Sequence, residues 1–325
     1  MAAQQKYDRK AEDLGNIVGL EHVNVTIPEQ GPAQEFYLMA LGFTRDPYMF
    51  PGTNNMWVNV GKSQFHLPTR GAQVLRGHVG VVVPSLDELC ERLGEARKKL
   101  DGTKFDCERH NEYVEATCPW GNKFRLYDPD PARFGAINLG IPYVQFDVPE
   151  GTADGIARFY REVFLAPAKV EENGEGRAAR VSVGHHQCLV FRETDRKLPE
   201  YDQHHIQVYV QEFSGPHDEL EARGLITEES DQYQYRFQDI VDLDTGKCLF
   251  TIEHEVRSCT HHLYNRRLVN RNPHQTNQHY QMGADEWDWT LPRSSGRLPA
   301  APQTIAANAS PLARTRARRV AQQAM

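Results

Sequence analysis

One pattern recurs along the chain and limits what it can fold into. An apolar-alternating strand is followed by an amphipathic helix and then by three short strands. The pattern begins with LEHVNVTI at residues 20–27 and again with GHVGVVV at residues 77–83, and weaker copies begin at Ile141 and His204. Repeats of one supersecondary unit are typical of folds built by stacking copies. We therefore predict an α+β fold class with four βαβββ units paired into two domains.

Length and composition set the predicted domain plan. The 325 residues suffice for two domains of about 150 residues each. A Pro-containing stretch after Tyr127 reads as a linker, and the Ala-, Pro-, Ser- and Arg-rich end from residue 291 is expected to be disordered. The predicted segments are a flexible start (1–17), a first domain (18–130), a linker (131–140), a second domain (141–256) and a C-terminal extension (257–325).

Net charge, apolar runs and cysteine content also argue against several classes of protein. A formal net charge of −7 argues against a nucleic-acid binder. The chain has no run of about 20 apolar residues to cross a membrane, and its polar start lacks the core of a signal peptide. Six cysteines without a CxxC pair favour reduced thiols and a cytoplasmic setting. We expect a small-molecule partner and a possible homo-oligomer, with no nucleic acid and no membrane.

Local signals place the helices of the first two units. A helix over 33–41 carries Phe36 and Tyr37 at helical spacing and ends at Gly42. A second helix over 85–100 opens with Ser85 and has Glu88 three residues later, which is a capping box.

Three stretches carry a family resemblance: EHVNVTIP…EFYLMALGF, GHVGVVVPSLDEL and GNKFRLYDPD. They resemble the vicinal oxygen chelate superfamily, which includes glyoxalase I, bleomycin-resistance proteins and type I extradiol dioxygenases. The resemblance covers about residues 18–255. It implies cupped mixed sheets with helices outside, around a divalent metal whose ligands lie on the first and last strand of each unit.

Strand alternation decides which side chains face the first cup. With the valines and other apolar residues packed beneath, the family's ligand positions carry His22, His66, His78 and Arg125. Three neutral imidazoles suit one divalent metal ion. The ion can be Zn²⁺, Fe²⁺, Mn²⁺, Ni²⁺ or Cu²⁺, and the likeness of the four-unit architecture to extradiol dioxygenases favours Fe²⁺.

Arg125 stands where the family has a carboxylate, and a cation cannot ligate a metal. It is predicted to bind an anionic substrate, unless it only forms a salt bridge on the strand. Glu115 on the adjacent strand is a candidate for the missing ligand or for a general base, and Tyr113 for a proton donor. Glu21 points away from the cup by strand parity.

The second half offers a weaker set. Its corresponding positions carry Tyr143, Leu189, His205 and Phe250. A shifted register would instead bring Glu253 beside His205, with Tyr143 nearby, as the resemblance to extradiol dioxygenases implies. The sequence favours a structural role for this half over a second site, and His254 points the opposite way from Glu253.

The predicted function is that of a metal-dependent enzyme with a mononuclear three-histidine centre. The four-unit architecture favours a non-haem iron dioxygenase acting on a small phenolic or enolisable substrate held through vicinal oxygens. One alternative is a glyoxalase-like isomerase, lyase or hydrolase using Zn²⁺, Ni²⁺ or Mn²⁺. The other is a metal-free binding protein of the resistance type, which has no need of three matched histidines.

Overall fold

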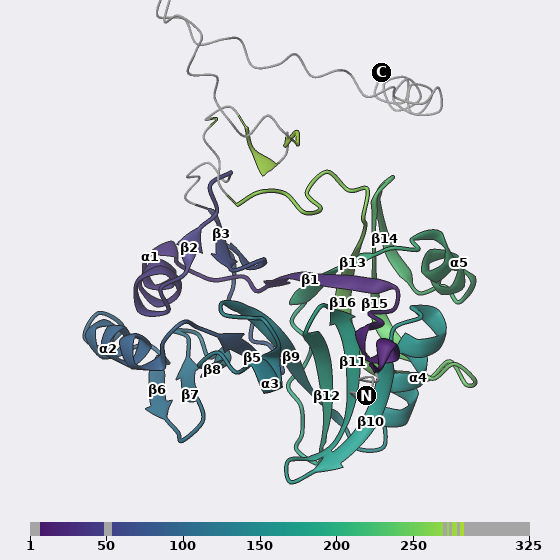
Figure 1. Ribbon diagram of the computed structural model, residues 1–325, viewed down its shortest axis with the longest axis horizontal. Helices are drawn as coiled ribbons and strands as arrows, with labels where there is room; N and C mark the ends of the chain where they lie inside the picture. Colours follow the sequence, from purple (N-terminus) through teal and green to yellow (C-terminus); the bar gives the residue numbers. More distant parts are fainter. Residues whose placement is uncertain (1–6, 49–53, 269–271, 273–274, 278–279, 283–325) are drawn as a thin grey trace, which may run out of the picture.

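The computed structural model describes residues 7–48, 54–268, 272, 275–277 and 280–282. Two eight-stranded mixed sheets dominate the molecule, and short helices cover their outer sides (Figure 1). This confirms the predicted α+β class and the four βαβββ units. In each unit the first strand pairs in parallel with the fourth.

The first sheet contains the first and last units of the chain. Its strands, in spatial order, are β14 (Ile226–Asp231), β15 (Gln234–Val241), β16 (Cys248–Ser258), β13 (His205–Val210), β1 (Ile17–Asn24), β4 (Ser63–Pro68), β3 (Asn55–Val60) and β2 (Thr44–Arg45). Its helices are α1 (Gln30–Ala33), η2 (Gln34–Ala40) and α5 (Ser214–Ala222). The predicted helix 33–41 thus begins three residues earlier, and its second part, η2, is wound as a π-helix.

The second sheet contains the two middle units. Its order is β10 (Ala168–Asn173), β11 (Gly176–Gly184), β12 (Gln187–Thr194), β9 (Gly140–Pro149), β5 (Gly77–Val82), β8 (Lys123–Tyr127), β7 (Val114–Thr117) and β6 (Asp106–Arg109). Its helices are α2 (Leu86–Ala96), α3 (Pro131–Phe134) and α4 (Ala153–Val163). Ser85 is the predicted N-cap, because its hydroxyl accepts a hydrogen bond from the Glu88 amide at 3.3 Å, whereas the Glu88 carboxylate lies near Arg92.

The pairing of units corrects the predicted domain plan. Apart from β1 and the residues before it, the two halves of the chain lie on opposite sides of the molecule, purple to blue and teal to green, but each sheet runs across both (Figure 1). Strand β1 pairs antiparallel with β13, and β5 pairs antiparallel with β9. Each cup is therefore shared between 18–130 and 141–256, because the exposed edge of a first strand is completed by a strand from the other half.

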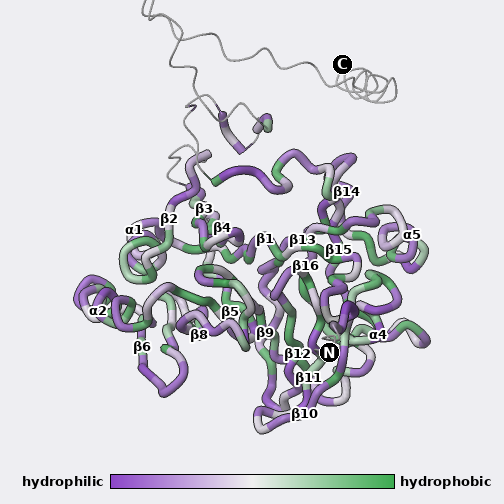
Figure 2. The backbone as a smooth tube through the Cα atoms, in the orientation of Figure 1, coloured by the Kyte–Doolittle hydropathy of each residue, from purple (hydrophilic) through white to green (hydrophobic). Residues whose placement is uncertain are grey.

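The apolar core joins consecutive units beneath the sheets. Helix η2 packs against α2, and the ring of Phe36 lies 5.5 Å from that of Phe124, on β8 of the other sheet. Tyr37 contacts both Phe65 and Phe124 at ring distances of 5.5 and 5.9 Å. Figure 2 shows the apolar stretches running along the strands of both sheets. The core holds the units of one half together while the sheets join the halves.

Gly77 is required where β5 meets β9. It has φ +148, and a Cβ at this position would overlap with the backbone carbonyl of Gln145. We expect Gly77→Ala to lower the free energy of unfolding by about 1–3 kcal/mol in chemical denaturation. Gly94→Ala is the matched control, because this exposed glycine lies inside α2 with open space around it and should gain about 0.5–1 kcal/mol. Equal effects of the two changes would contradict this assignment.

The C-terminal extension crosses the first sheet. After β16 the chain runs over β1 toward β2 and β3 (Figure 1). Leu263 and Tyr280 bury their side chains against Tyr48, and Arg266 forms a buried ion pair with Asp46 at 2.5 Å. The predicted flexible start falls partly, and the predicted disordered end from 291 wholly, outside the described residues.

Two further observations bear on the predicted setting. All six cysteines are unpaired. None of the helices in the described part of the chain is long and apolar enough to cross a membrane.

Candidate metal centre

Three histidines from three strands of the first sheet converge on one point. His22 lies on β1, His66 on β4 and His205 on β13, and one ring nitrogen of each lies within 4.8 Å of those of the other two. The ring of His22 is 5.8 Å from that of His66 and 5.7 Å from that of His205. Strand β1 lies between β4 and β13, so the edge shared by the two halves of the chain creates this cluster.

The free ring nitrogens fit a metal ion. Nδ1 of His22 lies 3.3 Å from the Glu21 carboxylate, and Nδ1 of His205 lies 3.4 Å from that of Glu253. Carboxylates on Nδ1 orient an imidazole so that Nε2 faces a metal. Nε2 of all three histidines is buried and makes no hydrogen bond within the described part of the chain. What singles out these three buried nitrogens is that they converge on one point, as the ligands of one metal ion do.

Burial keeps two of these imidazoles neutral. It lowers the pKa of His66 well below its usual value, and the neighbouring His22 and His205 lower it further. Burial, then the nearby His22 and Arg236, lower the pKa of His205 in the same way. Neutral imidazole is the form that binds metal, so the site needs no proton release at these two rings near neutral pH.

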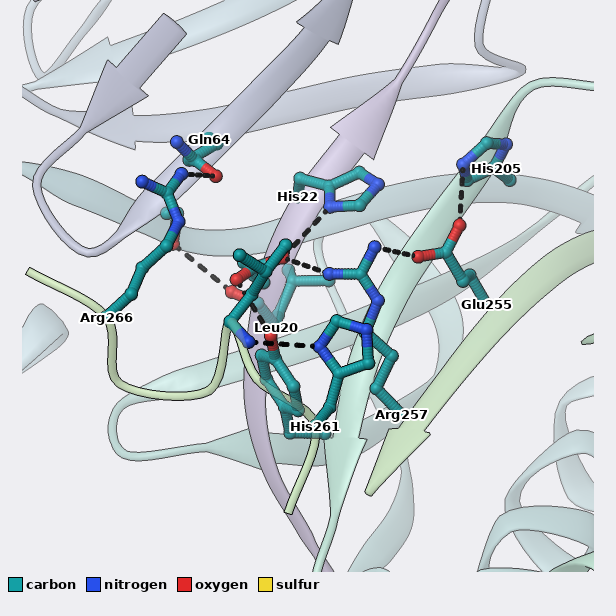
Figure 3. A network of polar contacts seen from close by, with 12 residues as sticks. Leu20, His22, Gln64, His205, Glu255, Arg257, His261 and Arg266 are labelled. Atoms are coloured by element: carbon teal, nitrogen blue, oxygen red, sulfur yellow. Dashed lines mark hydrogen bonds and ion pairs between the residues drawn. The ribbon is translucent and has the colours of Figure 1, made fainter. Parts of the chain in front are cut away.

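A carboxylate approaches the cluster from β16. Glu255 Oε2 lies 3.6 Å from His205 Nε2 (Figure 3). Burial alone would raise the pKa of Glu255, but Arg257, His22 and Arg236 outweigh it and lower the pKa to about 2. Arg257 binds this carboxylate at 2.5 Å, and Arg236 binds it from β15. Glu255 is therefore an ionised group held in place beside the histidines.

Glu21 is a site residue that strand parity missed. Its carboxylate lies at His22 and also binds Arg257 at 2.9 Å and the Tyr209 hydroxyl at 3.0 Å. The register between β1 and β13 shifts at this point, with Leu20 opposite Val208 and His22 opposite Gln207, so that Glu21 is an extra, bulged residue. A bulge breaks simple alternation, and the sequence carries no signal for it.

Trp57 covers the cluster on one side. Its ring stacks on that of His66 with centroids 4.1 Å apart, and meets the edge of His22 at 4.9 Å. This packing fixes the orientation of His66.

His78, predicted as the third ligand, is not part of this cluster. It lies on β5 in the second sheet, where its Nε2 contacts the Tyr143 hydroxyl at 3.1 Å. The third histidine of the cluster is His205, from the half that the sequence analysis favoured as structural. The difference arises because β1 pairs with β13 rather than sharing a sheet with β5.

The predicted catalytic residues lie in the second sheet or, for Tyr113, directly before its strand β7. Glu115 forms a 3.7 Å ion pair with Lys123, and Arg125 pairs with Glu175 at 3.0 Å and stacks over Tyr113. The structure therefore does not bring Glu115, Tyr113 or Arg125 to the three histidines.

His254 is buried in the core, and its burial predicts that acid destabilises the protein. It is fully buried, with Nε2 at 2.6 Å from the Tyr160 hydroxyl and its ring stacked on Phe237. Burial lowers the pKa of His254 from 6.5 to about 3. As the pH falls, His254 is protonated in the unfolded chain before it is protonated in the folded protein. The stability that the neutral, buried ring contributes is therefore complete above pH 6.5 and is lost as the pH falls toward 3.

We expect His254→Phe to flatten that pH dependence. Between pH 6 and 4, the slope of unfolding free energy against pH should fall by about 1.4 kcal/mol per pH unit, the value for one proton. Denaturant titrations at a series of pH values measure the slope. Parallel curves for the two proteins over this range would show that His254 does not titrate on unfolding.

The comparisons with known proteins agree with this architecture. No protein-family model matches the sequence, and no curated protein matches it. Among solved structures, glyoxalase I from Zea mays matches with TM-score 0.51 and 12% identity, over 76% of this chain and 96% of that one. A variant of the same enzyme gives 0.54 and 11%, over the same shares. A "putative dioxygenase" from Bacillus subtilis gives 0.50 and 16%, over 75% of this chain and 86% of that one.

These neighbours are members of the vicinal oxygen chelate superfamily. The chain has the fold of that superfamily, with four units and two cupped sheets. The identities are too low to transfer an activity, so function has to be argued from the site.

Proposed function

We propose that this chain is a metal-dependent enzyme whose mononuclear centre is held by His22, His66 and His205. The observation that carries the proposal is the set of three buried Nε2 atoms without hydrogen-bond partners among the described residues, two of them on rings oriented by carboxylates. Three protein ligands leave coordination positions for water and substrate, as catalytic metal sites require.

The reaction we propose is oxidation of a small phenolic or enolisable compound, with Fe²⁺ as the metal. Imidazole donors suit Fe²⁺, and also Zn²⁺, Ni²⁺ and Cu²⁺, so the donors alone do not select the ion. When bound, the metal would chelate vicinal oxygens of the substrate as a Lewis acid and, as iron, supply a redox centre for O₂. The likeness to the Bacillus subtilis structure supports this at the level of fold.

Glu255, the carboxylate nearest a ring Nε2 of the cluster, is poorly suited to proton transfer. A general base works best when its pKa lies near the working pH. Glu255, with a pKa of about 2 and two arginine partners, is a weak base. Its negative charge would instead balance that of a divalent ion held by the three histidines, while Arg257 and Glu21 hold the surrounding groups in place.

A glyoxalase-like isomerase, lyase or hydrolase using Zn²⁺, Ni²⁺ or Mn²⁺ is the second candidate. The likeness to the Zea mays glyoxalase I favours it. This candidate requires a base other than Glu255. A metal-free binding protein is the third candidate, and it leaves the three unpartnered nitrogens without a role.

Metal analysis followed by two activity panels separates these candidates. We expect one metal per purified chain, and O₂ uptake with at least one member of a catechol panel. No O₂ uptake, together with turnover of an α-ketoaldehyde–thiol adduct, would replace the oxygenase with the second candidate. If the purified protein neither contains nor takes up Fe²⁺, Zn²⁺, Ni²⁺ or Mn²⁺, the metal-free binding protein is the one candidate that remains. His66→Ala, checked for folding by circular dichroism, is the matched inactive variant.

The cytoplasmic setting stays a prediction. It is consistent with the six unpaired cysteines. Fractionation of cells that express the chain would test it.

A further inference from the structure

The second sheet has a cup of its own, built differently from the metal centre. Strands β5 and β9 meet there as β1 and β13 do in the first sheet. The ring of Tyr143 lies directly over Gly80, where a Cβ would overlap with it, and its hydroxyl contacts His78. Tyr143 therefore occupies the middle of this cup, and His78 is hydrogen-bonded to it rather than converging with other histidines.

Beside Tyr143 lies a cavity of about 140 Å³ lined by four arginines. They come from four elements: Arg125 on β8, Arg133 on α3, Arg180 on β11 and Arg192 on β12. Arg192 is buried, and Nε of both Arg125 and Arg192 is buried without a hydrogen bond to any described residue. Gathering four guanidinium groups around one cavity, with that of Arg192 buried, is unfavourable unless negative charge compensates them.

The carboxylates near these arginines leave the cavity wall positive. Arg180 is paired with Glu171 at 3.0 Å and Arg133 with Glu112 at 3.4 Å, and both carboxylates lie outside the lining. Glu175 is the one acidic residue in the lining, and it bridges Arg125 at 3.0 Å and Arg192 at 3.1 Å.

Glu175 also shows what chemistry the cavity accepts. It lies in the turn between β10 and β11, and its side chain is 56% exposed. The Glu175 carboxylate reaches Arg125 and Arg192 from an exposed turn, and it occupies the position at which a free oxyanion would bind. Because it is exposed, its exchange for a ligand costs little desolvation.

We propose that this cup binds a small oxyanion, the carboxylate of an organic acid or a phosphate, between Arg125, Arg180 and Arg192. Guanidinium groups bind both kinds of anion through paired, charge-assisted hydrogen bonds. Tyr127 and Tyr143, whose hydroxyls are hydrogen-bonded to each other at 2.8 Å, add an aromatic wall. The site needs no metal and is separate from the three histidines, so it does not depend on the proposed enzyme activity.

Calorimetric titration of the full chain with inorganic phosphate and with benzoate tests the proposal and separates the two sources. We expect one of them to bind one to one, more weakly as salt is added. Neutral benzamide is the ligand control. Arg125→Gln and Arg180→Gln should each weaken binding at least about tenfold. Arg177→Gln is the matched control, because this arginine is paired with Asp154 and does not line the cavity.

Glu175→Gln gives a test in the opposite direction. Removing the competing carboxylate should strengthen binding about threefold or more, a gain that misfolding cannot imitate. The proposal is overturned by any of three results: neither anion binds at about 10 mM, benzamide binds as well as benzoate, or Glu175→Gln leaves binding unchanged or weaker.

Discussion

His205→Ala is expected to abolish stoichiometric metal binding, whereas His78→Ala is expected to retain it. His205 Nε2 is one of the three converging nitrogens, while the ring of His78 is hydrogen-bonded to Tyr143 in the other sheet. Loss of an outer-shell partner already weakens metal sites 10–100-fold, so loss of a direct ligand should weaken this one more than about 100-fold. Metal content by mass spectrometry and competition with a chelating dye measure the change.

The paired variants make this result specific. Both residues are buried first-strand histidines of a unit, so a general loss of fold would affect both variants alike. Far-UV circular dichroism confirms that each variant is folded. Metal retained in His205→Ala and lost in His78→Ala would restore the ligand set predicted from the sequence and would refute the cluster in the first sheet.

Arg266→Ala is expected to destabilise the protein by about 3–5 kcal/mol, the usual effect of leaving one charge of a buried pair without its partner. Arg266 and Asp46 have side-chain exposures of 3% and 0%. Gln64 connects the pair to the metal centre: its amide group binds Asp46 at 2.7 Å and Arg266 at 3.1 Å, and it lies opposite His22 in the β1–β4 register. Denaturant unfolding measures the loss.

The control is an exposed arginine in an ion pair. Arg196 pairs with Asp147 at 2.8 Å but is 73% exposed, so Arg196→Ala should change stability by less than about 1 kcal/mol. The double variant Arg266→Gln with Asp46→Asn should recover part of the loss, because no unpaired charge remains. An Arg266→Ala protein as stable as Arg196→Ala would mean that the C-terminal extension is not anchored at Asp46.

Local patterns predicted the building blocks well. Alternation and capping signals located the strands within 20–27 and 77–83 and the start of the helix at Ser85, because these depend on neighbours within a few residues. The same alternation placed His22 and His66 on one face, and the structure brings these two together.

The third histidine could not be found in this way. Four similar units offer several ways of pairing their edge strands, and each gives the same alternation along the chain. The bulge that turns Glu21 toward His22 arises only when β1 lies against β13.

The sequence by itself determined the four units, the α+β class and which side chains point away from the apolar core, since all of these follow from periodicity. Only the tertiary structure decided that the first unit shares a sheet with the fourth, which puts His205 beside His22 and His66 and leaves His78 to Tyr143. The physical reason is that hydrogen bonds between strand edges are the same for any partner. The choice among partners therefore depends on how the whole chain packs.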